Sequence, residues 1–420
     1  MTDRAAPIDP TLAPHFSWIG ERPVAKVLRA LLDAEADCAR FVGGCVRDSL
    51  LGETPKDIDI ATTLTPDHVI AALKRAHLGA APTGIEHGTV TAIADHRGVE
   101  VTTLRADVST DGRRASVAFT RDWAVDARRR DFTINALYLT PALELFDPVG
   151  GAEDLARRRV RFIGAADERI GEDYLRILRF FRFSARFAPS FDEAGLQACA
   201  SLKEGMRQLS AERVGDEMMK LLSLPSPQSA LAAMAASGVL AEVWPVAPEI
   251  ETLARLKAID PKAAPTLALA ALYGARGEGV DARLRLSNAQ ALRRRHAIRN
   301  AALIDPALDD RGARALLYRM GAEAWRDACL LAEAEALAQS DAPGARQPEF
   351  ARLHTLPDRW PPPALPFSGK DALSLGAPEG PAIAGIIRAA EARWIAEDFP
   401  PPARARAIFA EETARAISKG

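Results

Sequence analysis

The residues best suited to chemistry in this chain lie in one short stretch, residues 41–63. Asp57 and Asp59 are separated there by a single isoleucine, and Ile60 follows them. Residues two apart on a β-strand point to the same face, so the two carboxylates would project side by side while the isoleucines face a core. Two adjacent anions are costly unless a cation lies between them, and hard oxygen ligands suit Mg2+. The spacing therefore predicts a magnesium site.

A glycine-containing turn precedes the two aspartates. Gly43 and Gly44 interrupt an apolar run, and Arg47 and Asp48 follow on a short amphipathic segment. Glycines let the backbone approach an anion closely, and the N–H groups of the next turn can then point at it. A phosphate-binding turn beside a carboxylate pair predicts metal-assisted nucleotidyl transfer. Each pattern alone is more often a plain turn or a solvated edge, so it is their combination that favours this chemistry.

The combination resembles a known family signature. The run from Gly43 to Thr62 is similar, without a break, to Gly-Gly-x-Val-Arg-Asp-x-Leu-Leu-Gly followed by Asp-x-Asp-x-x-Thr. That is the catalytic motif of the tRNA nucleotidyltransferase and bacterial poly(A) polymerase family, which includes the class II CCA-adding enzymes. The resemblance implies an α+β fold, in which a small polymerase beta-like nucleotidyltransferase α/β head is followed by an all-helical neck, body and tail.

The same resemblance implies a role for each residue of the motif. Asp57 and Asp59 are the expected catalytic residues and the expected ligands of two Mg2+ ions. One ion would activate the primer 3′-hydroxyl, and the other would neutralise the triphosphate and the leaving pyrophosphate. The residues expected to seat the triphosphate are Gly43, Gly44, Arg47 and Asp48.

Residues 88–105 are predicted to form two strands joined by a turn around residues 95–98. Glu100 lies in the second strand, on the face that it shares with Thr102 and Leu104. It is a candidate third metal ligand, although a solvent-facing edge residue would show the same pattern. Residues 106–123 show no clean periodicity and are predicted to form a loop over the site.

A second motif, Arg-Arg-Asp-Phe-Thr-Ile-Asn-Ala, occupies residues 129–136. The segment 132–139 is predicted to be a strand with alternate residues on opposite faces. The run resembles the second motif of the family, which implies that Arg130, Asp131 and Asn135 contact the ribose and phosphates of the nucleotide. Arginine offers planar, bidentate donors for phosphate, and aspartate accepts hydrogen bonds from ribose hydroxyls.

Residues 172–187 are predicted to form one amphipathic helix. Four arginines share an arc of this helix and would repel one another unless anions face them: Arg176, Arg179, Arg182 and Arg186. A triphosphate, an RNA backbone or acidic residues of a neighbouring element could supply those anions. Arg179 and Arg182 are therefore candidates for nucleotide contacts.

The start of this helix, Glu-Asp-x-x-Arg, resembles the fourth motif of the family. The resemblance implies that Asp173 and Arg176 present hydrogen-bonding edges to the incoming base, so that the protein itself acts as the template. The alternative is an ordinary ion pair between residues three apart on a helix, which contributes little to stability.

The composition indicates an ordinary globular protein. Of the 420 residues, 48% are hydrophobic and 26% are charged, and roughly two to four domains are expected. The four cysteines are scattered and indicate neither a zinc site nor a disulfide framework. No apolar run reaches the roughly 20 residues that span a bilayer, and the N-terminus lacks a signal-peptide core, so a cytoplasmic protein without membrane contact is expected. A net charge of −2 does not by itself indicate nucleic-acid binding.

The predicted domain order is a loose leader over 1–20, a catalytic head over 21–148, a neck over 149–225, a helical RNA-binding body over 226–340, a Pro-rich linker over 341–366 and a helical tRNA-binding tail over 367–420. The candidate RNA contacts in body and tail are Arg293, Arg294, Lys370 and Gly380. Arginine runs are more often solvated helix ends, and a glycine before a helix can be a plain surface cap.

The expected activity is template-independent addition of C, C and A to the 3′ end of tRNA, from CTP and ATP, without an obligate protein partner. A poly(A) polymerase is the alternative within the family. Residues 84–90, which resemble CCA-adding enzymes, and the slightly acidic net charge disfavour it. Enzymes that add only CC or only A share these motifs and remain open. The intact Asp57 and Asp59 disfavour an inactive RNA-binding module.

Overall fold

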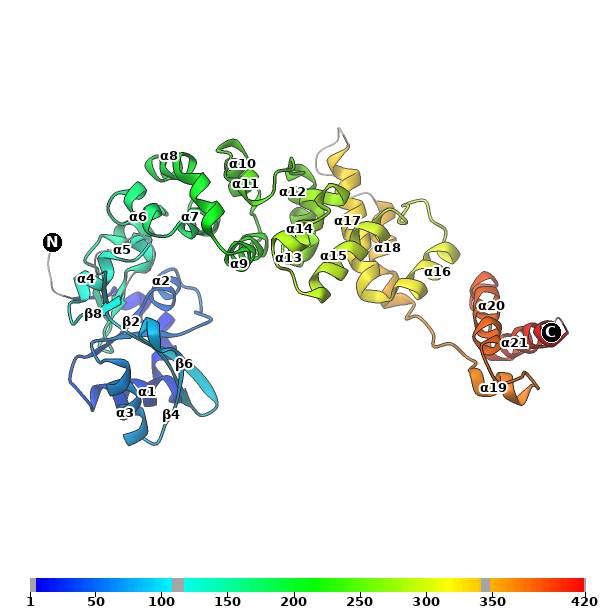
Figure 1. Cartoon of the computed structure of the whole chain (residues 1–420), viewed down its shortest axis with the longest axis horizontal. Coiled ribbons are helices and arrows are strands. Elements are labelled where there is room, and N and C mark those ends of the chain that lie inside the picture. Colours follow the sequence, from blue (N-terminus) through cyan, green and yellow to red (C-terminus); the bar gives the residue numbers. More distant parts are fainter. Residues whose placement is uncertain (1–4, 108–116, 341–347, 419–420) are drawn as a thin grey trace. The chain divides into compact units, whose positions relative to one another are not determined.

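The computed structural model describes residues 5–107, 117–340 and 348–418. The chain divides into two compact units (Figure 1). The first contains the residues up to Val214 together with Ala233–Val243, and the second contains Gly215–Ala232 and the residues from Trp244 onward. All described strands lie in the first unit, and the described elements of the second are helical. The predicted α+β fold, with a mixed head followed by a helical remainder, is confirmed.

An eight-stranded sheet forms the centre of the first unit. Its strand order is β1-β10-β9-β2-β3-β6-β5-β4. Strands β3 and β6 are parallel, and this register pairs Asp59 with Glu100. The bounds are β1 Ala6–Pro7, β2 Ala39–Val42, β3 Asp59–Thr62, β4 Gly79–Gly84, β5 Thr89–Ala94, β6 Arg97–Thr103, β9 Tyr138–Leu139 and β10 Glu144–Phe146. The two strands expected within residues 88–105 are thereby confirmed as β5 and β6.

Helices α1 (Arg22–Leu32) and α3 (Pro66–Arg75) cover the sheet and pack against each other (Figure 1). The apolar residues of α1 recur at helical spacing and are buried: Val24, Val27, Leu28 and Leu31. Burying such a stripe contributes most of the stability of a short helix.

The prediction of a loose leader over residues 1–20 is wrong for its described part. Strand β1 pairs with β10, and residues Pro10–Gly20 form a 3-10 helix, η1. Trp18 is 4% exposed, lies edge-on to Phe41 at 4.8 Å between ring centroids, and donates a hydrogen bond from Nε1 to Ser49 Oγ at 2.8 Å. The aromatic side chains anchor the segment because burying them removes a large apolar area from water.

The predicted strand over 132–139 is also wrong in large part. Residues Thr133–Asn135 form a 3-10 helix, η3, and only Tyr138–Leu139 joins the sheet. Every residue from 131 to 139 is buried, so the segment has no solvent-facing side. The polar residues of the apparent alternation are buried because they are hydrogen-bonded: Thr133 Oγ1 donates to Asp154 Oδ2 at 2.6 Å and Asn135 Nδ2 donates to Asp131 Oδ1 at 3.0 Å. Asp154 belongs to α5 (Gly151–Ala156), which packs against η3.

The helix predicted over residues 172–187 is confirmed from residue 175 onward, but its first residues are interrupted by a break. Helix α6 (Ala166–Glu172) ends before Asp173, whose backbone is extended at φ −156° and ψ 104°, and α7 (Leu175–Phe187) then begins. The first unit also contains α2 (Gly44–Leu50), α4 (Trp123–Arg128), α8 (Glu193–Leu202), the 3-10 helices η2 (Ile85–His87) and η4 (Lys203–Gln208), and α11 (Val239–Val243). Two helices are divided between the units: α9 (Ala211–Leu222) begins in the first and ends in the second, and α10 (Gln228–Ala236) begins in the second and ends in the first.

The predicted loop over residues 106–123 lies partly outside the described residues, which omit 108–116. Its flanks pair as a separate two-stranded sheet, β7 (Arg105–Asp107) with β8 (Val117–Phe119). The described flanks are therefore ordered by backbone hydrogen bonds rather than irregular.

The second unit is a helical assembly. Helix α17 contacts α12, α13, α15, α16 and α18, and its Trp325 is fully buried. The bounds are α12 Ile250–Ile259, α13 Pro265–Tyr273, η5 Gly274–Gly277, α14 Val280–Arg283, α15 Asn288–Ala301, α16 Asp310–Met320, α17 Ala322–Ala338, α18 Pro348–Arg359, α19 Gly369–Ser374, α20 Ala382–Ala396 and α21 Pro402–Ile417. Among the described residues, no helix is long and apolar enough to cross a membrane.

The Pro-rich linker predicted over 341–366 is wrong for residues 348–359, which form α18. Phe350, Leu353 and Leu356 of this helix are buried, and Trp325 Nε1 donates to the Leu353 carbonyl oxygen at 2.9 Å. The composition was misleading because an apolar helical stripe lies between the prolines. The predicted boundaries at residues 148 and 225 stay predictions.

The close packing of α5 on η3 yields a stability prediction. A Cβ added at Gly151 would lie 2.1 Å from the Thr133 carbonyl oxygen, so the backbone would have to move. We expect Gly151→Ala to lower the free energy of unfolding by about 1–3 kcal/mol, measured by urea denaturation. The matched control is Gly171→Ala, where nothing lies within 4 Å of the added Cβ. It should be neutral or slightly stabilising, and equal losses in both variants would contradict the packing explanation.

Candidate nucleotidyl-transfer site

Acidic side chains gather at the start of β3. Asp59 is half-buried on the first residue of the strand, Asp57 is exposed two residues earlier, and Glu100 lies beside Asp59 on β6. Burial, together with the negative charges of Glu100 and Asp57, raises the pKa of Asp59 to about 6. Arg130 opposes this shift only in part. A carboxylate held among like charges is a site that a cation would stabilise.

These residues fit Mg2+ by chemistry, since they offer only carboxylate oxygens. Among the described residues, however, no three His, Cys, Asp or Glu side chains converge closely enough to form a metal site. Glu100 therefore stays a prediction as a third ligand. Ile58 and Ile60 are buried at 5% and 0% exposure, as predicted for the opposite face.

The glycine turn brings the backbone next to Arg130. Gly43 has φ +72° and ψ −121°, a conformation that side-chain-bearing residues rarely adopt. A Cβ at this position would lie 3.8 Å from Arg130 Nη1 and 3.6 Å from the Asn135 carbonyl oxygen. Gly44 begins α2 immediately afterwards. The turn thus lies between the carboxylates of β3 and the second motif.

Arg47 and Asp48 are buried and join α2 to neighbouring elements. Arg47 Nε donates to Asp48 Oδ1 at 2.8 Å and Nη1 donates to Asn135 Oδ1 at 2.5 Å. The Arg47 guanidinium also lies 4.4 Å from the centre of the Phe187 ring on α7. Because Arg47 is only 5% exposed, its predicted contact with the triphosphate stays a prediction.

Asp131 and Asn135 belong to the same network. Asp131 accepts hydrogen bonds from Asn135 Nδ2 at 3.0 Å and from Arg179 Nε at 2.8 Å. Burial raises the pKa of Asp131, but Arg179 and these hydrogen bonds outweigh it and hold the pKa below its usual value. The structure therefore brings Asp131, Asn135 and Arg179 together.

Asp126, which no motif singled out, forms a second buried cluster. It is 2% exposed and accepts hydrogen bonds from Tyr138 Oη at 2.7 Å and from Arg130 Nη2 at 3.1 Å. Arg129 Nε and the Arg105 backbone N–H donate to its other oxygen, at 3.1 and 3.0 Å. The available sequence signal was its position four residues before Arg130, a spacing that places two side chains together on a helix.

Asp173 and Arg176 are not paired with each other. Asp173 accepts a hydrogen bond from Arg213 Nη2 at 2.8 Å, whereas Arg176 Nη1 donates to Glu172 and to the Arg169 carbonyl oxygen. The expected neighbour relation assumed a continuous helix, and the break at Asp173 removes it. Both side chains remain partly exposed, and their predicted contact with the base stays a prediction.

The arginines on one side of α7 form ion pairs largely with acidic residues of the head. Arg186 Nη2 lies 3.2 Å from Asp48 Oδ2 and 2.7 Å from Glu53 Oε2. Arg182 stacks over the Phe183 ring at 4.4 Å. Acidic neighbours were one of the alternatives that the sequence left open, and they allow the arginines to lie close together without a bound anion.

The predicted RNA contact of Arg294 is wrong. Its side chain is 3% exposed and donates to Asp281 Oδ1 at 2.5 Å and to the Gly277 carbonyl oxygen at 3.0 Å. Arg293 is more exposed but is paired with Asp327 and Glu323. Lys370 on α19 and Gly380 before α20 are exposed, and their roles stay predictions. The run of arginines misled because one face of α15 points into the core.

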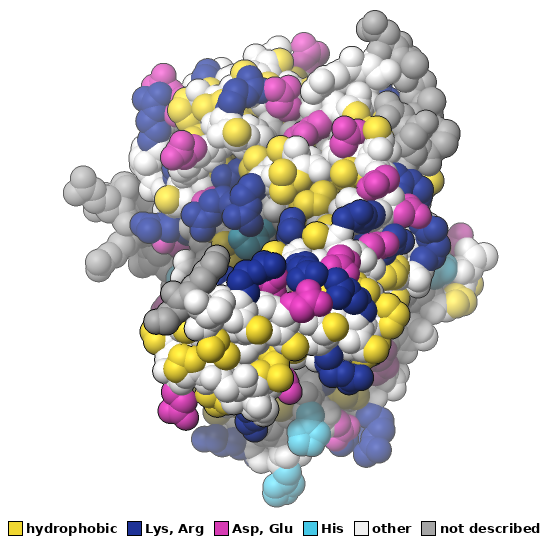
Figure 2. All heavy atoms as spheres, turned by 90° about the vertical axis from the view of Figure 1, so that its right-hand side faces the viewer, with side chains coloured by type: hydrophobic (Ala, Val, Ile, Leu, Met, Phe, Trp, Pro, Cys, Tyr) yellow, Lys and Arg dark blue, Asp and Glu magenta, His cyan; other side chains and the backbone are white. Residues whose placement is uncertain are grey.

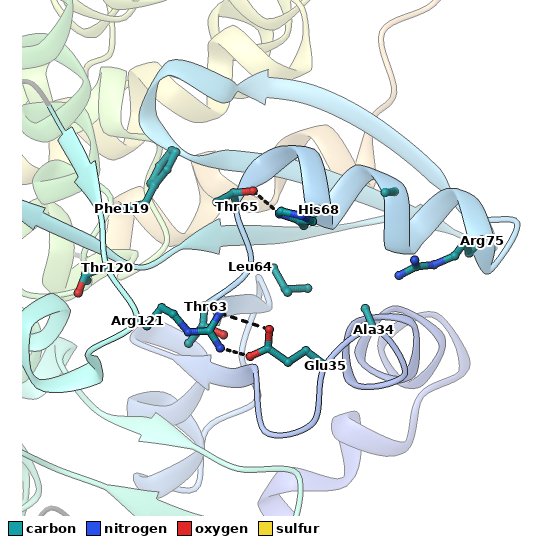
Figure 3. Close-up of a pocket in the computed structure, with 11 residues that line it drawn as sticks. Ala34, Glu35, Thr63, Leu64, Thr65, His68, Arg75, Phe119, Thr120 and Arg121 are labelled. Carbon is teal, nitrogen blue, oxygen red and sulfur yellow. Dashed lines mark hydrogen bonds and ion pairs between the residues drawn. The ribbon is translucent and has the colours of Figure 1, made fainter.

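A cavity of about 390 Å³ in the head lies apart from these residues (Figure 3). Figure 3 shows Arg121 against Glu35, and Thr65 Oγ1 lies 2.7 Å from His68 Nδ1. Thr63, which directly follows the end of β3, is the lining residue nearest to Asp59 along this strand. The length of that strand separates Thr63 from Asp59 by roughly 13 Å. None of the predicted nucleotide residues lines this cavity.

The Asp126 cluster predicts a specific acid sensitivity. Burial raises the pKa of Asp126, but Arg130, Arg129 and the Tyr138 hydroxyl outweigh it and lower the pKa to about 2. A carboxylate with a depressed folded-state pKa stabilises the protein above its unfolded pKa, and this contribution is lost as pH falls from about 4 to about 2. We expect a loss of about 2 kcal/mol over that window.

The measurement is the free energy of urea unfolding at pH 5 and at pH 3. Asp126→Asn should be less stable than the wild type at pH 5, and the difference should shrink at pH 3. A constant difference would show that Asp126 does not stabilise the fold as an anion. Comparing variant with wild type removes the effect of carboxylates that both proteins share, such as Asp131.

Two segments of the chain match models of known protein families. Residues 39–161 match the model of the poly(A) polymerase head domain, and residues 190–251 match the model described as a probable RNA- and SrmB-binding site of polymerase A. CCA tRNA nucleotidyltransferase 1, mitochondrial, from Homo sapiens is 45% identical over 201 residues, which are 47% of this chain and 46% of that protein. The CCA-adding enzyme of Oceanobacillus iheyensis is 44% identical over 183 residues, 43% of this chain and 45% of that protein.

The chain spans about half the length of the curated relatives it matches. The structural comparison extends further. The crystal structure of the Bacillus stearothermophilus CCA-adding enzyme in complex with CTP matches with a TM-score of 0.75 and 27% identity, and covers 95% of this chain and 100% of that one. The matching head domain contains the run from Gly43 to Thr62 and the cluster around Arg130. Residues 39–161 therefore form a head domain of the poly(A) polymerase type, and the fold over 95% of the chain is similar to that of a CCA-adding enzyme.

Proposed function

We propose that this protein adds C, C and A to the 3′ end of tRNA, without a nucleic-acid template, from CTP and ATP. The observation that carries the proposal is the position of Asp59. Its half-buried carboxylate lies among like charges, in the same part of the head as the Gly43 turn and Arg130. Relatives named as CCA-adding enzymes, one of them in complex with CTP, support tRNA and these nucleotides as substrates.

Asp57 and Asp59 would hold Mg2+, which when bound would neutralise triphosphate charge and activate the primer 3′-hydroxyl. The other residues bind and orient the substrate. The Gly43 turn would let a phosphate approach the backbone, and Arg130 would donate hydrogen bonds to it. Asp173 and Arg176 would present an acceptor and a donor to the base. No covalent nucleophile is required, since positioning and charge stabilisation suffice for phosphoryl transfer.

Asp173 and Arg176 can read the base only if the base replaces the residues with which they are now paired. Asp173 is paired with Arg213 and Arg176 with Glu172, and each of these pairs is partly exposed. Exposed pairs of this kind are weak, so a base could replace either partner at little cost. A cytoplasmic location forms part of the proposal, because all four cysteines are free thiols, as expected in a reducing compartment.

The central prediction concerns the product. A tRNA transcript ending at the discriminator base should gain two C residues with CTP alone, and then one A and no more when ATP is also present. Long A tracts with ATP alone would instead indicate a poly(A) polymerase. A single A added only to tRNA ending in CC would indicate an A-adding enzyme, and arrest after CC with both nucleotides would indicate a CC-adding one.

The catalytic prediction concerns the carboxylate pair. Asp59→Ala should reduce incorporation by roughly 1,000-fold or more, because Mg2+ contributes several kcal/mol of charge stabilisation. Chelation of divalent ions by EDTA should abolish wild-type activity, and added Mg2+ should restore it. The control is Asp67→Ala on the exposed face of α3, which should retain wild-type rates. Equal activity of Asp59→Ala and the control would contradict the assignment.

The base-selection prediction is read from nucleotide preference. Asp173→Ala and Arg176→Ala should allow misincorporation of UTP and GTP, because the hydrogen-bonding edge that selects C and A is lost. Arg207→Ala is the control, since it removes an exposed pair with Glu242 and no predicted base contact. If the two variants lose rate with all four nucleotides equally, their role is structural.

A further inference from the structure

The guanidinium of Arg130 is held along one edge and open along the other. Its Nε and Nη2 donate to Asp126 Oδ2 at 3.2 and 3.1 Å, and Nε also donates to Tyr138 Oη at 3.1 Å. Within the described part of the chain, Nη1 makes no hydrogen bond, and it lies 3.8 Å from where a Gly43 Cβ would be. The fixed edge thus determines that the open edge faces the glycine turn.

The carboxylate of Asp126 is itself held in place by several hydrogen bonds. Besides Arg130, its two oxygens accept hydrogen bonds from Tyr138, Arg129 and the backbone of Arg105. It is fully saturated and 2% exposed, so it cannot move without leaving several donors unpaired. The Tyr138 ring in turn lies edge-on to Trp123, at 5.6 Å between centroids, which limits the rotation of the hydroxyl.

A purely structural role does not account for this arrangement equally well. Buried ion pairs seldom stabilise a protein more than apolar residues of the same volume would. A long arginine side chain that is 22% exposed also loses rotamer freedom when it is held in one orientation. Both costs are understandable if the orientation of Arg130 is itself the purpose, because a pre-oriented guanidinium loses little entropy when it binds phosphate.

We infer that Asp126 is a positioning residue, with Tyr138 as its support, that holds Arg130 so that Nη1 donates to a phosphate of the incoming nucleotide at the Gly43 turn. This inference rests on the proposed function, because it assigns Asp126 a part in the same nucleotide site. Asp126 itself does not touch the substrate. Its effect on nucleotide binding therefore passes through Arg130.

A double-mutant cycle tests this dependence. The variants are Asp126→Asn, Arg130→Ala and the double variant, and the readouts are KM for CTP, kcat and the Kd of CTP measured by calorimetry. Asp126→Asn should raise KM and Kd about 10-fold while kcat changes less than about 3-fold. Adding Asp126→Asn to Arg130→Ala should change them by less than about 2-fold, because the group that it positions is already absent. Additive effects in the cycle would overturn the inference.

Two further variants separate positioning from loss of folding. Asp122 caps α4, the helix of Asp126, by accepting from the N–H groups of Ala124 and Val125. Asp122→Ala should cost about 1 kcal/mol of stability and leave KM for CTP unchanged. Tyr138→Phe, which keeps the ring and removes the hydroxyl, should raise KM in the same direction as Asp126→Asn. A rise of KM in Asp122→Ala equal to that of Asp126→Asn would overturn the inference, since disturbance of α4 would then suffice.

The outcomes also distinguish this inference from the proposed function. If the wild type binds CTP but adds no nucleotide to tRNA, the proposed function fails, while the binding cycle still decides the role of Asp126. If the wild type adds nucleotides and the cycle is additive, only the role of Asp126 fails. Absence of CTP binding by the wild type would overturn both.

Discussion

A buried charge needs a partner of opposite sign, and this constraint organises the first unit. Asp131, Asp126 and Asp48 are each at most 9% exposed, and each is paired with arginine. Removing one partner of such a pair leaves an uncompensated charge, which typically costs about 3–5 kcal/mol. The Asp131–Arg179 and Asp48–Arg186 pairs join residues of different elements, so each of these two pairs also sets the position of one element against another.

The pairs connect the head to helix α7. Arg179 binds Asp131 of the second motif, and Arg186 binds Asp48 of the first. The aromatic face of α7 lies against Arg47 through Phe187 and Phe183. The two motifs and the helix are therefore held together by contacts within the protein itself. A guanidinium has five donors, so arginines that already face carboxylates can still bind phosphate with their remaining edges.

Asp59 is the exception to this rule of compensation. Its nearest charged neighbours include Glu100 and Asp57, and these raise its pKa rather than lower it. Carboxylates with a shifted pKa and no full compensation by positive charge are common at functional sites, where a substrate or ion supplies the missing opposite charge. Most other described acidic groups of the first motifs are already paired, so Asp59 stands out by electrostatics as well as by sequence.

The second unit carries mixed rather than segregated charge. In the tail, Arg393 and Arg404 share the carboxylates of Glu397 and Glu411. Basic and acidic side chains lie next to one another on the face drawn in Figure 2. Such mixed charge differs from the single strongly basic patch that is typical of proteins held to nucleic acid by charge alone.

The sequence by itself determined the fold class and the type of the head domain, and it supplied the candidate residues of the site. The Gly-Gly turn and the Asp-x-Asp pair are local, since their chemistry depends on spacings of one or two residues. Tertiary structure alone decided the burial of Trp18 and α18, the 3-10 conformation of Thr133–Asn135, the break at Asp173 and the burial of Arg294. Tertiary structure also brought the Asp126 carboxylate into hydrogen-bonding contact with Arg130. Each of these depends on which other segment covers the residue, and a local pattern of polar and apolar residues does not contain that information.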